Sequence, residues 1–214
     1  MINDLWPTFH LTITTAHLRL RLPREAEIAQ LAELAGRGIH RRSERPFLTP
    51  WTDGSAKDRA EIVLQSHWSE LAEWTVDDWA LGMGIFTDTG EPVGMVTLRA
   101  KDFSVVREVT TSSWLGLPHH GRGFGTEARK GVLTLAFDHL GAEAARSEVF
   151  QDNHASQAVS RKLGYEPDGI SRDARGSEVL TSDRLRLSRS RWADVPSGGI
   201  VVDGIDACRH MFNR

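Results

Sequence analysis

The feature that most constrains this fold is a run of alternating glycines between a strand-like and a helix-like segment, within residues 109–140. The segment opens with residues of high strand propensity, namely Val109, Thr110, Thr111 and Trp114. Gly116 and Pro118 end it, and Gly121, Gly123 and Gly125 follow. Apolar residues then recur at helical spacing at Val132, Leu133, Ala136, Phe137 and Leu140. The pattern predicts a strand, a glycine-rich loop and a helix, in that order.

Such a loop is expected to bind an anion. Glycines allow a tight turn and a close approach of the backbone, and the new helix adds unpaired N–H groups and the positive end of its dipole. Two well-known phosphate loops do not fit. A dinucleotide fingerprint would need glycine at position 126, which is Thr126, and a P-loop would need a Gly-Lys-Ser/Thr sequence, which the chain lacks.

The loop His120-Gly121-Arg122-Gly123-Phe124-Gly125 resembles the Gln/Arg-x-x-Gly-x-Gly/Ala pyrophosphate loop of the GNAT acyl-CoA N-acyltransferase superfamily. His120 departs from the Gln or Arg that the family mostly has. Downstream, Asn153 and Ser156 match the family's Asn-x-x-Ala/Ser, and Leu163-Gly164-Tyr165 matches its Gly-Phe/Tyr. Residues 46–47, 51, 77–79 and 101–103 are most similar to the ribosomal-protein-alanine acetyltransferase (RimJ/RimL-like) branch.

The order of elements is typical of a single α+β (α/β) domain. Strands are expected at 18–22, 79–86, 92–98, 109–117, 144–150, 165–171 and 184–192. Helices are expected at 25–39, 58–75 and 155–163, a further helix is expected after the glycine run up to about residue 140, and a loop is expected at 40–54. The resemblance implies the GNAT fold: a twisted, mixed but mostly antiparallel sheet of about seven strands flanked by helices, with a V-shaped splay between the fourth and fifth strands.

We expect one domain over residues 1–195 and a C-terminal extension over residues 196–214. The extension lies outside the family resemblance. Its apolar stretch at 200–202 predicts an added edge strand or a subunit contact, and we expect a homo-oligomer, with a dimer favoured.

Composition excludes several classes of protein. The net charge is −3 and no basic block is present, so a nucleic-acid partner is not expected. A single cysteine, Cys208, rules out an internal disulfide and fits a reducing compartment. The chain has no eighteen-residue apolar run and no basic start followed by an apolar segment, so we expect a cytoplasmic protein that does not enter a membrane.

The resemblance implies a set of cofactor contacts. The residues expected to bind acetyl-CoA or another acyl-CoA are Trp114, Leu115, Gly116, His120, Gly121, Arg122, Gly123, Phe124, Gly125, Thr126, Asn153 and Ser156. Main-chain amides of the loop would hold the pyrophosphate, and the strand at 114–116 would pair with the pantetheine arm, with Gly116 allowing a kink. No metal is expected, because His119 and His120 lack the i,i+4 spacing of a helical metal pair.

The catalytic residues implied by the resemblance are Ser156 and Asn153. The family frequently has a tyrosine at the position of Ser160, and this tyrosine protonates the departing thiolate. Because this chain has serine there, Ser156 is the closest available hydroxyl, by analogy with family members that use a serine at its position. Both Ser156 and Asn153 could instead serve only to cap their helix. Glu108, His119 and His40 are all conceivable general bases.

The loop at 40–54 supplies the expected substrate-binding residues Phe47, Trp51 and His40. Bulky rings in a loop either fill the domain's own core or face a ligand, and the sequence leaves both readings open.

The predicted function is N-acyl transfer of an acetyl or succinyl-type group from acyl-CoA to a primary amine of a small molecule or protein, by direct attack in a ternary complex. A non-catalytic acyl-CoA-binding or sensing protein is the alternative, because the tyrosine is missing and the base is not identified. A nucleotide-binding enzyme is a third possibility, which would be stabilised by ATP or NAD more than by coenzyme A.

Overall fold

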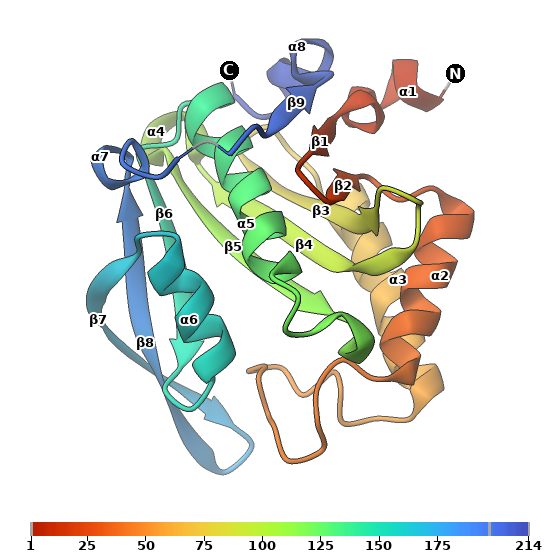
Figure 1. Ribbon diagram of the computed structural model, residues 1–214, viewed down its shortest axis with the longest axis vertical. Coiled ribbons are helices and arrows are strands. Elements are labelled where there is room, and N and C mark those ends of the chain that lie inside the picture. Colours follow the sequence, from red (N-terminus) through yellow and green to blue (C-terminus); the bar gives the residue numbers. More distant parts are fainter. Residues whose placement is uncertain (1, 197, 214) are drawn as a thin grey trace.

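A computed structural model describes residues 2–196 and 198–213 (Figure 1). Its centre is a nine-stranded mixed sheet in the order β7-β8-β6-β5-β4-β3-β2-β1-β9. The strands are β1 (Thr12–Thr14), β2 (Leu18–Arg21), β3 (Asp78–Thr87), β4 (Pro92–Lys101), β5 (Glu108–Leu115), β6 (Ala144–Phe150), β7 (Glu166–Arg175), β8 (Glu178–Ser188) and β9 (Val201–Asp203). Within the described residues, β5 and β6 run parallel and every other neighbouring pair is antiparallel.

Helices cover both faces of the sheet (Figure 1). The longer ones are α2 (Glu25–Arg37), α3 (Ala56–Ala72), α5 (Phe124–Thr134) and α6 (His154–Lys162). Short ones are α1 (Ile2–Leu5), α4 (Phe103–Val106), α7 (Arg189–Trp192), α8 (Ile205–Cys208) and the single turns η1 (Pro7–His10), η2 (Leu117–His119), η3 (Leu135–His139) and η4 (Arg209–Met211). One apolar cluster joins α2 and α3 to the sheet, and a second joins α5 to the opposite face.

The predicted V-shaped splay is present. The pairing of β5 with β6 ends at Thr110 and Arg146, although β5 continues to Leu115 and β6 continues to Phe150. Beyond that point β5 pairs only with β4, and β6 pairs only with β8. The carboxyl-terminal halves of the two parallel strands therefore have free edges that face each other across a gap.

The sheet has two strands beyond the seven expected from the family resemblance. β9 lies in the C-terminal stretch for which the sequence left open an edge strand or a subunit contact. β1 was not predicted, because its three residues are too few to show a period-two pattern. The last strand also differs from the prediction, because β8 begins at Glu178 and ends at Ser188. The Ser188 hydroxyl accepts a hydrogen bond from the Arg191 N–H (3.3 Å), which starts α7 and ends the strand.

The C-terminal tail packs on the domain. Strand β9 pairs with β1 at the sheet edge, and Ile205, Cys208 and Phe212 are buried in the same apolar cluster as α5. The Phe212 carbonyl accepts a hydrogen bond from the Trp79 indole (3.1 Å). Burial raises the pKa of the Cys208 thiol to about 11, so this thiol is a poor nucleophile.

Across the described part of the chain, we found no helix that combines the length and the apolar character needed to span a bilayer.

Candidate acyl-CoA site

The glycine loop turns directly into α5. Gly121 and Gly123 have φ values of 75° and 83°, a left-handed conformation that favours glycine. A Cβ atom added at either glycine would meet no other atom within 4 Å, so the space in front of the loop is open. No side chain caps the helix, and the N–H groups of Phe124, Gly125 and Thr126 have no acceptor among the described residues. The arrangement is a ready site for a phosphate group.

Glu127 links the first turn of α5 to the connection between β1 and β2. Its carboxylate accepts hydrogen bonds from the Thr15 hydroxyl (2.6 Å) and from the His17 N–H (2.8 Å) and ring (3.1 Å). Partial burial alone would raise the pKa of Glu127, but these bonds outweigh it and the pKa is lowered. The loop is thus presented by a helix whose first turn is anchored.

Two side chains of the loop lie back on the protein. The Arg122 guanidinium stacks over the Phe124 ring at 4.6 Å, which leaves it exposed beside the open space. A ring nitrogen of His120 lies 3.0 Å from the Leu115 carbonyl oxygen. Since a carbonyl only accepts, His120 donates this bond and links the loop to the end of β5.

The free edge of β5 points into the gap between β5 and β6. The Gly116 N–H donates to the Val93 carbonyl (3.0 Å), and hydrogen bonding alternates along an antiparallel pair. Trp114 is therefore bonded to β4, whereas Thr111, Ser113 and Leu115 direct their N–H and C=O groups toward β6, which has already diverged. This edge can pair with an extended ligand that carries amide groups.

The structure corrects the expected role of Gly116. Its φ of −58° is ordinary, so it makes no kink in the strand. A Cβ atom there would instead lie 2.5 Å from Leu34 Cδ1, so a larger residue would need the Leu34 side chain of α2 to move. The side chains of Trp114 and Leu115 lie on opposite faces of the sheet, Trp114 against the α2 cluster and Leu115 against the α5 cluster.

Helix α6 forms the other wall of the gap. Asn153 caps it, since its side-chain oxygen accepts a hydrogen bond from the Ser156 N–H (3.1 Å). The Ser156 hydroxyl is half-buried and has no hydrogen-bond partner among the described residues. Ser160 is fully buried, and its hydroxyl accepts a hydrogen bond from Arg129 Nη1 (3.2 Å).

Arg129 is a buried cation that the sequence analysis missed. Only 6% of it is exposed, and it makes no ion pair with any described residue. Its Nε has no hydrogen-bond partner among the described residues. Burial lowers the pKa of Arg129 and raises that of Tyr165. A signal was available, because Arg129 lies three residues before Val132 on the apolar stripe of α5.

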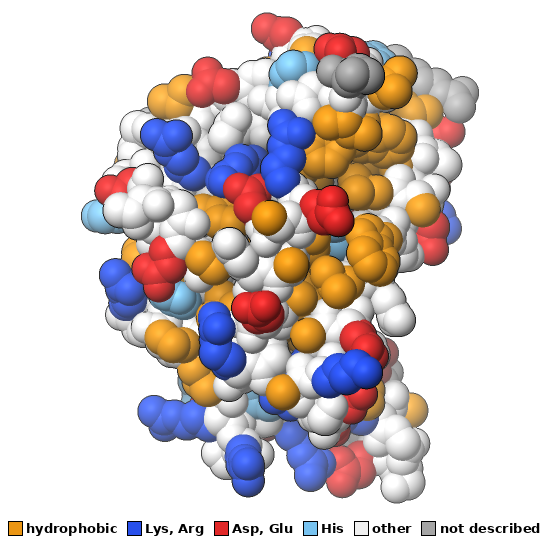
Figure 2. Space-filling view, turned by 90° about the vertical axis from the view of Figure 1, so that its right-hand side faces the viewer, with side chains coloured by type: hydrophobic (Ala, Val, Ile, Leu, Met, Phe, Trp, Pro, Cys, Tyr) orange, Lys and Arg blue, Asp and Glu red, His pale blue; other side chains and the backbone are white. Residues whose placement is uncertain are grey.

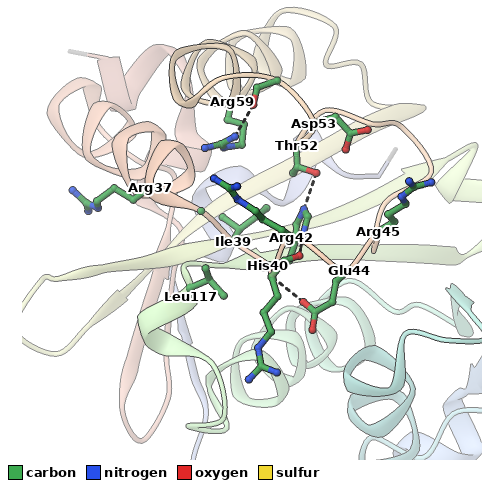
Figure 3. Close-up of a pocket in the computed structure, with 13 residues that line it drawn as sticks. Arg37, Ile39, His40, Arg42, Glu44, Arg45, Thr52, Asp53, Arg59 and Leu117 are labelled. Carbon is green, nitrogen blue, oxygen red and sulfur yellow. Dashed lines mark hydrogen bonds between the residues drawn. The ribbon is translucent and has the colours of Figure 1, made fainter.

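On the opposite face, loop 38–55 forms an aromatic wall and a pocket. The ring of Phe47 lies 5.2 Å from that of Trp51, and Trp51 lies 6.3 Å from Trp114 of β5. The pocket has a volume of about 670 Å³ (Figure 3). It is lined by Arg37, Gly38, Ile39, His40, Arg41, Arg42, Glu44, Arg45, Thr52, Asp53, Gly54, Arg59 and Leu117.

The three conceivable bases lie in different places. Glu108 is at the closed end of the splay and forms ion pairs with Arg186 (2.6 Å) and Arg146 (3.9 Å). His119 is buried, and burial lowers its pKa. His40 lines the pocket, where its Nδ1 lies 2.8 Å from the Arg41 carbonyl and its Nε2 lies 2.8 Å from the Thr52 hydroxyl. The structure thus brings only His40 of these three to the pocket.

A splayed pair of parallel strands beside an anion-binding helix start defines the class of acyl-CoA-dependent N-acyltransferases. The family model described as "Acetyltransferase (GNAT) domain" matches residues 17–166, and this chain belongs to that family. The match and the named relatives below support the RimJ/RimL-like branch. GNAT enzymes use acetyl-CoA as the acyl donor.

Relatives and solved structures agree with this assignment. YdaF of Bacillus subtilis (strain 168), provisionally named a ribosomal N-acetyltransferase, is 25% identical over 157 residues, covering 73% of this chain and 82% of YdaF. The structure of RimL, named a ribosomal L7/L12 alpha-N-protein acetyltransferase and solved with coenzyme A, has a TM-score of 0.63 at 16% identity, covering 81% of this chain and 95% of RimL. A GCN5-related N-acetyltransferase from Brucella melitensis has a TM-score of 0.68 at 17% identity, covering 86% and 81%.

Proposed function

We propose that this enzyme transfers an acetyl group from acetyl-CoA to a primary amine by direct attack in a ternary complex. The carrying observation is that the chain places unpaired N–H groups at the start of α5 and leaves the carboxyl-terminal half of β5 unpaired on the side where β6 diverges from it. Acetyl-CoA supplies an activated acyl group. The N–H groups of Phe124, Gly125 and Thr126 hold its pyrophosphate, with Arg122 adding charge.

The free edge of β5 orients the acyl donor. Among residues 114–116, Leu115 is the one whose N–H faces the gap, since Gly116 donates to Val93 and Trp114 is bonded to β4. We therefore assign the stabilisation of developing negative charge on the acyl oxygen to the Leu115 N–H. The His120 bond to the Leu115 carbonyl fixes the next peptide group, between Leu115 and Gly116.

Proton transfer is assigned to His40 and Ser156. Because the Arg41 carbonyl can only accept, His40 Nδ1 carries the proton and Nε2 is free to accept one from the attacking amine once Thr52 turns away. The Ser156 hydroxyl, which has no partner among the described residues, donates a proton to the departing thiolate. Asn153 positions Ser156 by capping the first turn of α6.

The acceptor is proposed to be a protein amine or a small amine that enters from the α2 and α3 face, past Phe47 and Trp51. The names of YdaF and RimL, which refer to ribosomal proteins, support a protein amine. A succinyl-type donor remains an alternative to acetyl. A cytoplasmic location and a homodimer remain predictions, and light scattering on the purified protein tests the second.

Gly123→Glu tests the donor site directly. It places a carboxylate in the open space before α5, so we expect coenzyme A affinity to fall at least about tenfold, or 1.4 kcal/mol. Gly199→Glu is the matched control, because Gly199 has a similar φ of 71° and equally open surroundings but lies in the C-terminal tail. Calorimetry measures coenzyme A binding, and thiol release with acetyl-CoA or succinyl-CoA over a panel of amines measures transfer.

Equal coenzyme A affinity in folded Gly123→Glu and Gly199→Glu would show that this loop does not bind the pyrophosphate. Coenzyme A binding without thiol release on any amine would instead favour an acyl-CoA sensor. The burial of Ser160 against Arg129, at the position where the family often has tyrosine, is the observation that would favour that reading.

A further inference from the structure

The pocket in loop 38–55 is unusually basic for this chain. Five arginines line it against two carboxylates, although the whole chain has a net charge of −3 and Figure 2 shows both acidic and basic side chains on one face of the molecule. We propose that the pocket selects an acceptor with acidic residues next to its reactive amine. This inference rests on the proposed N-acyl transfer and names the chemical class of its acceptor.

Both carboxylates of the pocket are already engaged. Glu44 accepts a hydrogen bond from the Arg41 backbone N–H (3.0 Å), which closes the turn of the loop. Asp53 accepts one from Arg175 Nη2 (2.9 Å), at the tip of the β7–β8 hairpin. Neither carboxylate therefore neutralises an arginine side chain of the pocket itself.

Two of the five arginines, Arg59 and Arg45, already have partners within the protein. Arg59 is held by the carbonyls of Ala35 (3.3 Å), Gly36 (2.7 Å) and Gly54 (2.6 Å), so it serves to close the end of α2. Arg45 lies 3.5 Å from Glu178 in an exposed pair of little strength.

The side chains of Arg37, Arg41 and Arg42 make no hydrogen bond or ion pair with any described residue. Figure 3 shows Arg42 extending from the loop toward the side of the pocket where Arg59 lies, and Arg37 at the pocket's edge. Three cations without partners around one cavity form a surface that attracts carboxylates.

The position of the pocket assigns it to the acceptor. It lies at the end of α2 and α3, on the opposite face of the sheet from α5 and its phosphate site. The two sites nonetheless adjoin, because Leu117, just before the glycine loop, lines the pocket and donates its N–H to the Gly38 carbonyl (3.2 Å). A ligand here can reach the end of β5 without crossing the donor path.

The experiment compares two pentapeptides with a free N-terminal serine, one with four glutamates after the serine and the other with four glutamines, each carrying a C-terminal fluorescein. Anisotropy measures peptide binding at 20 mM and 200 mM salt, conditions chosen because screening weakens exposed charge pairs. Acetyl transfer from acetyl-CoA is measured separately. The variant Arg41→Gln/Arg42→Gln removes two of the free cations. Arg19→Gln is the control, since Arg19 is exposed on β2 and makes no ion pair or side-chain hydrogen bond with a described residue.

We expect the glutamate peptide to bind at least about tenfold more tightly than the glutamine peptide at low salt, corresponding to a few exposed charge pairs. The double variant should lose this preference and keep its affinity for coenzyme A, and Arg19→Gln should behave as the wild type. Equal binding of both peptides, or a loss of coenzyme A affinity in the double variant instead, would overturn the inference. Because binding is measured without turnover, a failure of acetyl transfer would count against the proposed function alone.

Discussion

Replacing Arg129 by methionine should make this enzyme more stable and less active. Arg129 is only 6% exposed. Among the described residues, its guanidinium has one neutral hydrogen-bond partner, the Ser160 hydroxyl, and no carboxylate to form an ion pair with. Moving a charge out of water costs several kcal/mol, and one hydroxyl bond recovers only about 1 kcal/mol of that. Since burial lowers the pKa of Arg129, the folded state disfavours the charged form at every working pH below the ordinary arginine value.

The magnitude follows from what methionine keeps and loses. It keeps most of the apolar stem that packs between α5 and α6, and it removes the charge. Ser160 loses its donor but can bond to a carbonyl one turn back in its own helix. We expect a net gain of about 2 kcal/mol in the free energy of unfolding, which raises Tm by roughly 4–8 °C for a chain of this size.

The assay is urea unfolding of the protein without coenzyme A, together with kcat/KM for acetyl transfer. Arg129→Lys keeps the charge and should give no gain. Arg161→Met is the matched surface control, because Arg161 is exposed on α6, and it should change stability by less than about 0.5 kcal/mol. We expect kcat/KM of Arg129→Met to fall about tenfold, because the charge lies beside the donor path and favours the developing thiolate.

A loss of more than about 1 kcal/mol in Arg129→Met would refute this reasoning, because it would mean that the folded protein compensates the charge. A gain in stability with unchanged kcat/KM would uphold the energetic argument and remove Arg129 from the donor site.

Two further predictions concern stability. Burial lowers the pKa of His67, so below the unfolded-state value of about 6.5 the unfolded chain takes up this proton more readily than the folded one, and stability falls as the pH falls. His67→Leu should shrink the stability difference between pH 7.5 and 5.5, by at most about 1.4 kcal/mol, and an unchanged difference in urea titrations would contradict the assignment. Phe212→Ala should cost about 3–5 kcal/mol, because this fully buried ring packs 5.0 Å from Trp79. Val201→Ala, at a half-exposed site in the same tail, should cost far less, and equal losses in thermal melts would argue against the packing of Phe212.

Much of the fold was determined by local sequence. Alternating Leu18 and Leu20, the apolar stripe of α2 and the turn between β3 and β4 all have short-range signatures. The predicted elements formed close to their predicted bounds, except β8, which begins six residues before the predicted 184. The glycine loop was predicted for the same reason, since Gly121 and Gly123 have the positive φ values that glycine favours. The cap at Asn153 is equally local.

Only the tertiary structure decided which groups meet. Three-residue strands such as β1 and β9 are fixed by their partners, and Gly116 packs closely against Leu34 of a distant helix. His40 lines the pocket, whereas Glu108 lies at the closed end of the splay. Arg129 and the free arginines of loop 38–55 have ordinary sequence contexts, and their importance comes from what surrounds them. Backbone conformation depends on neighbours in sequence, whereas burial and charge compensation depend on neighbours in space, which the linear pattern does not contain.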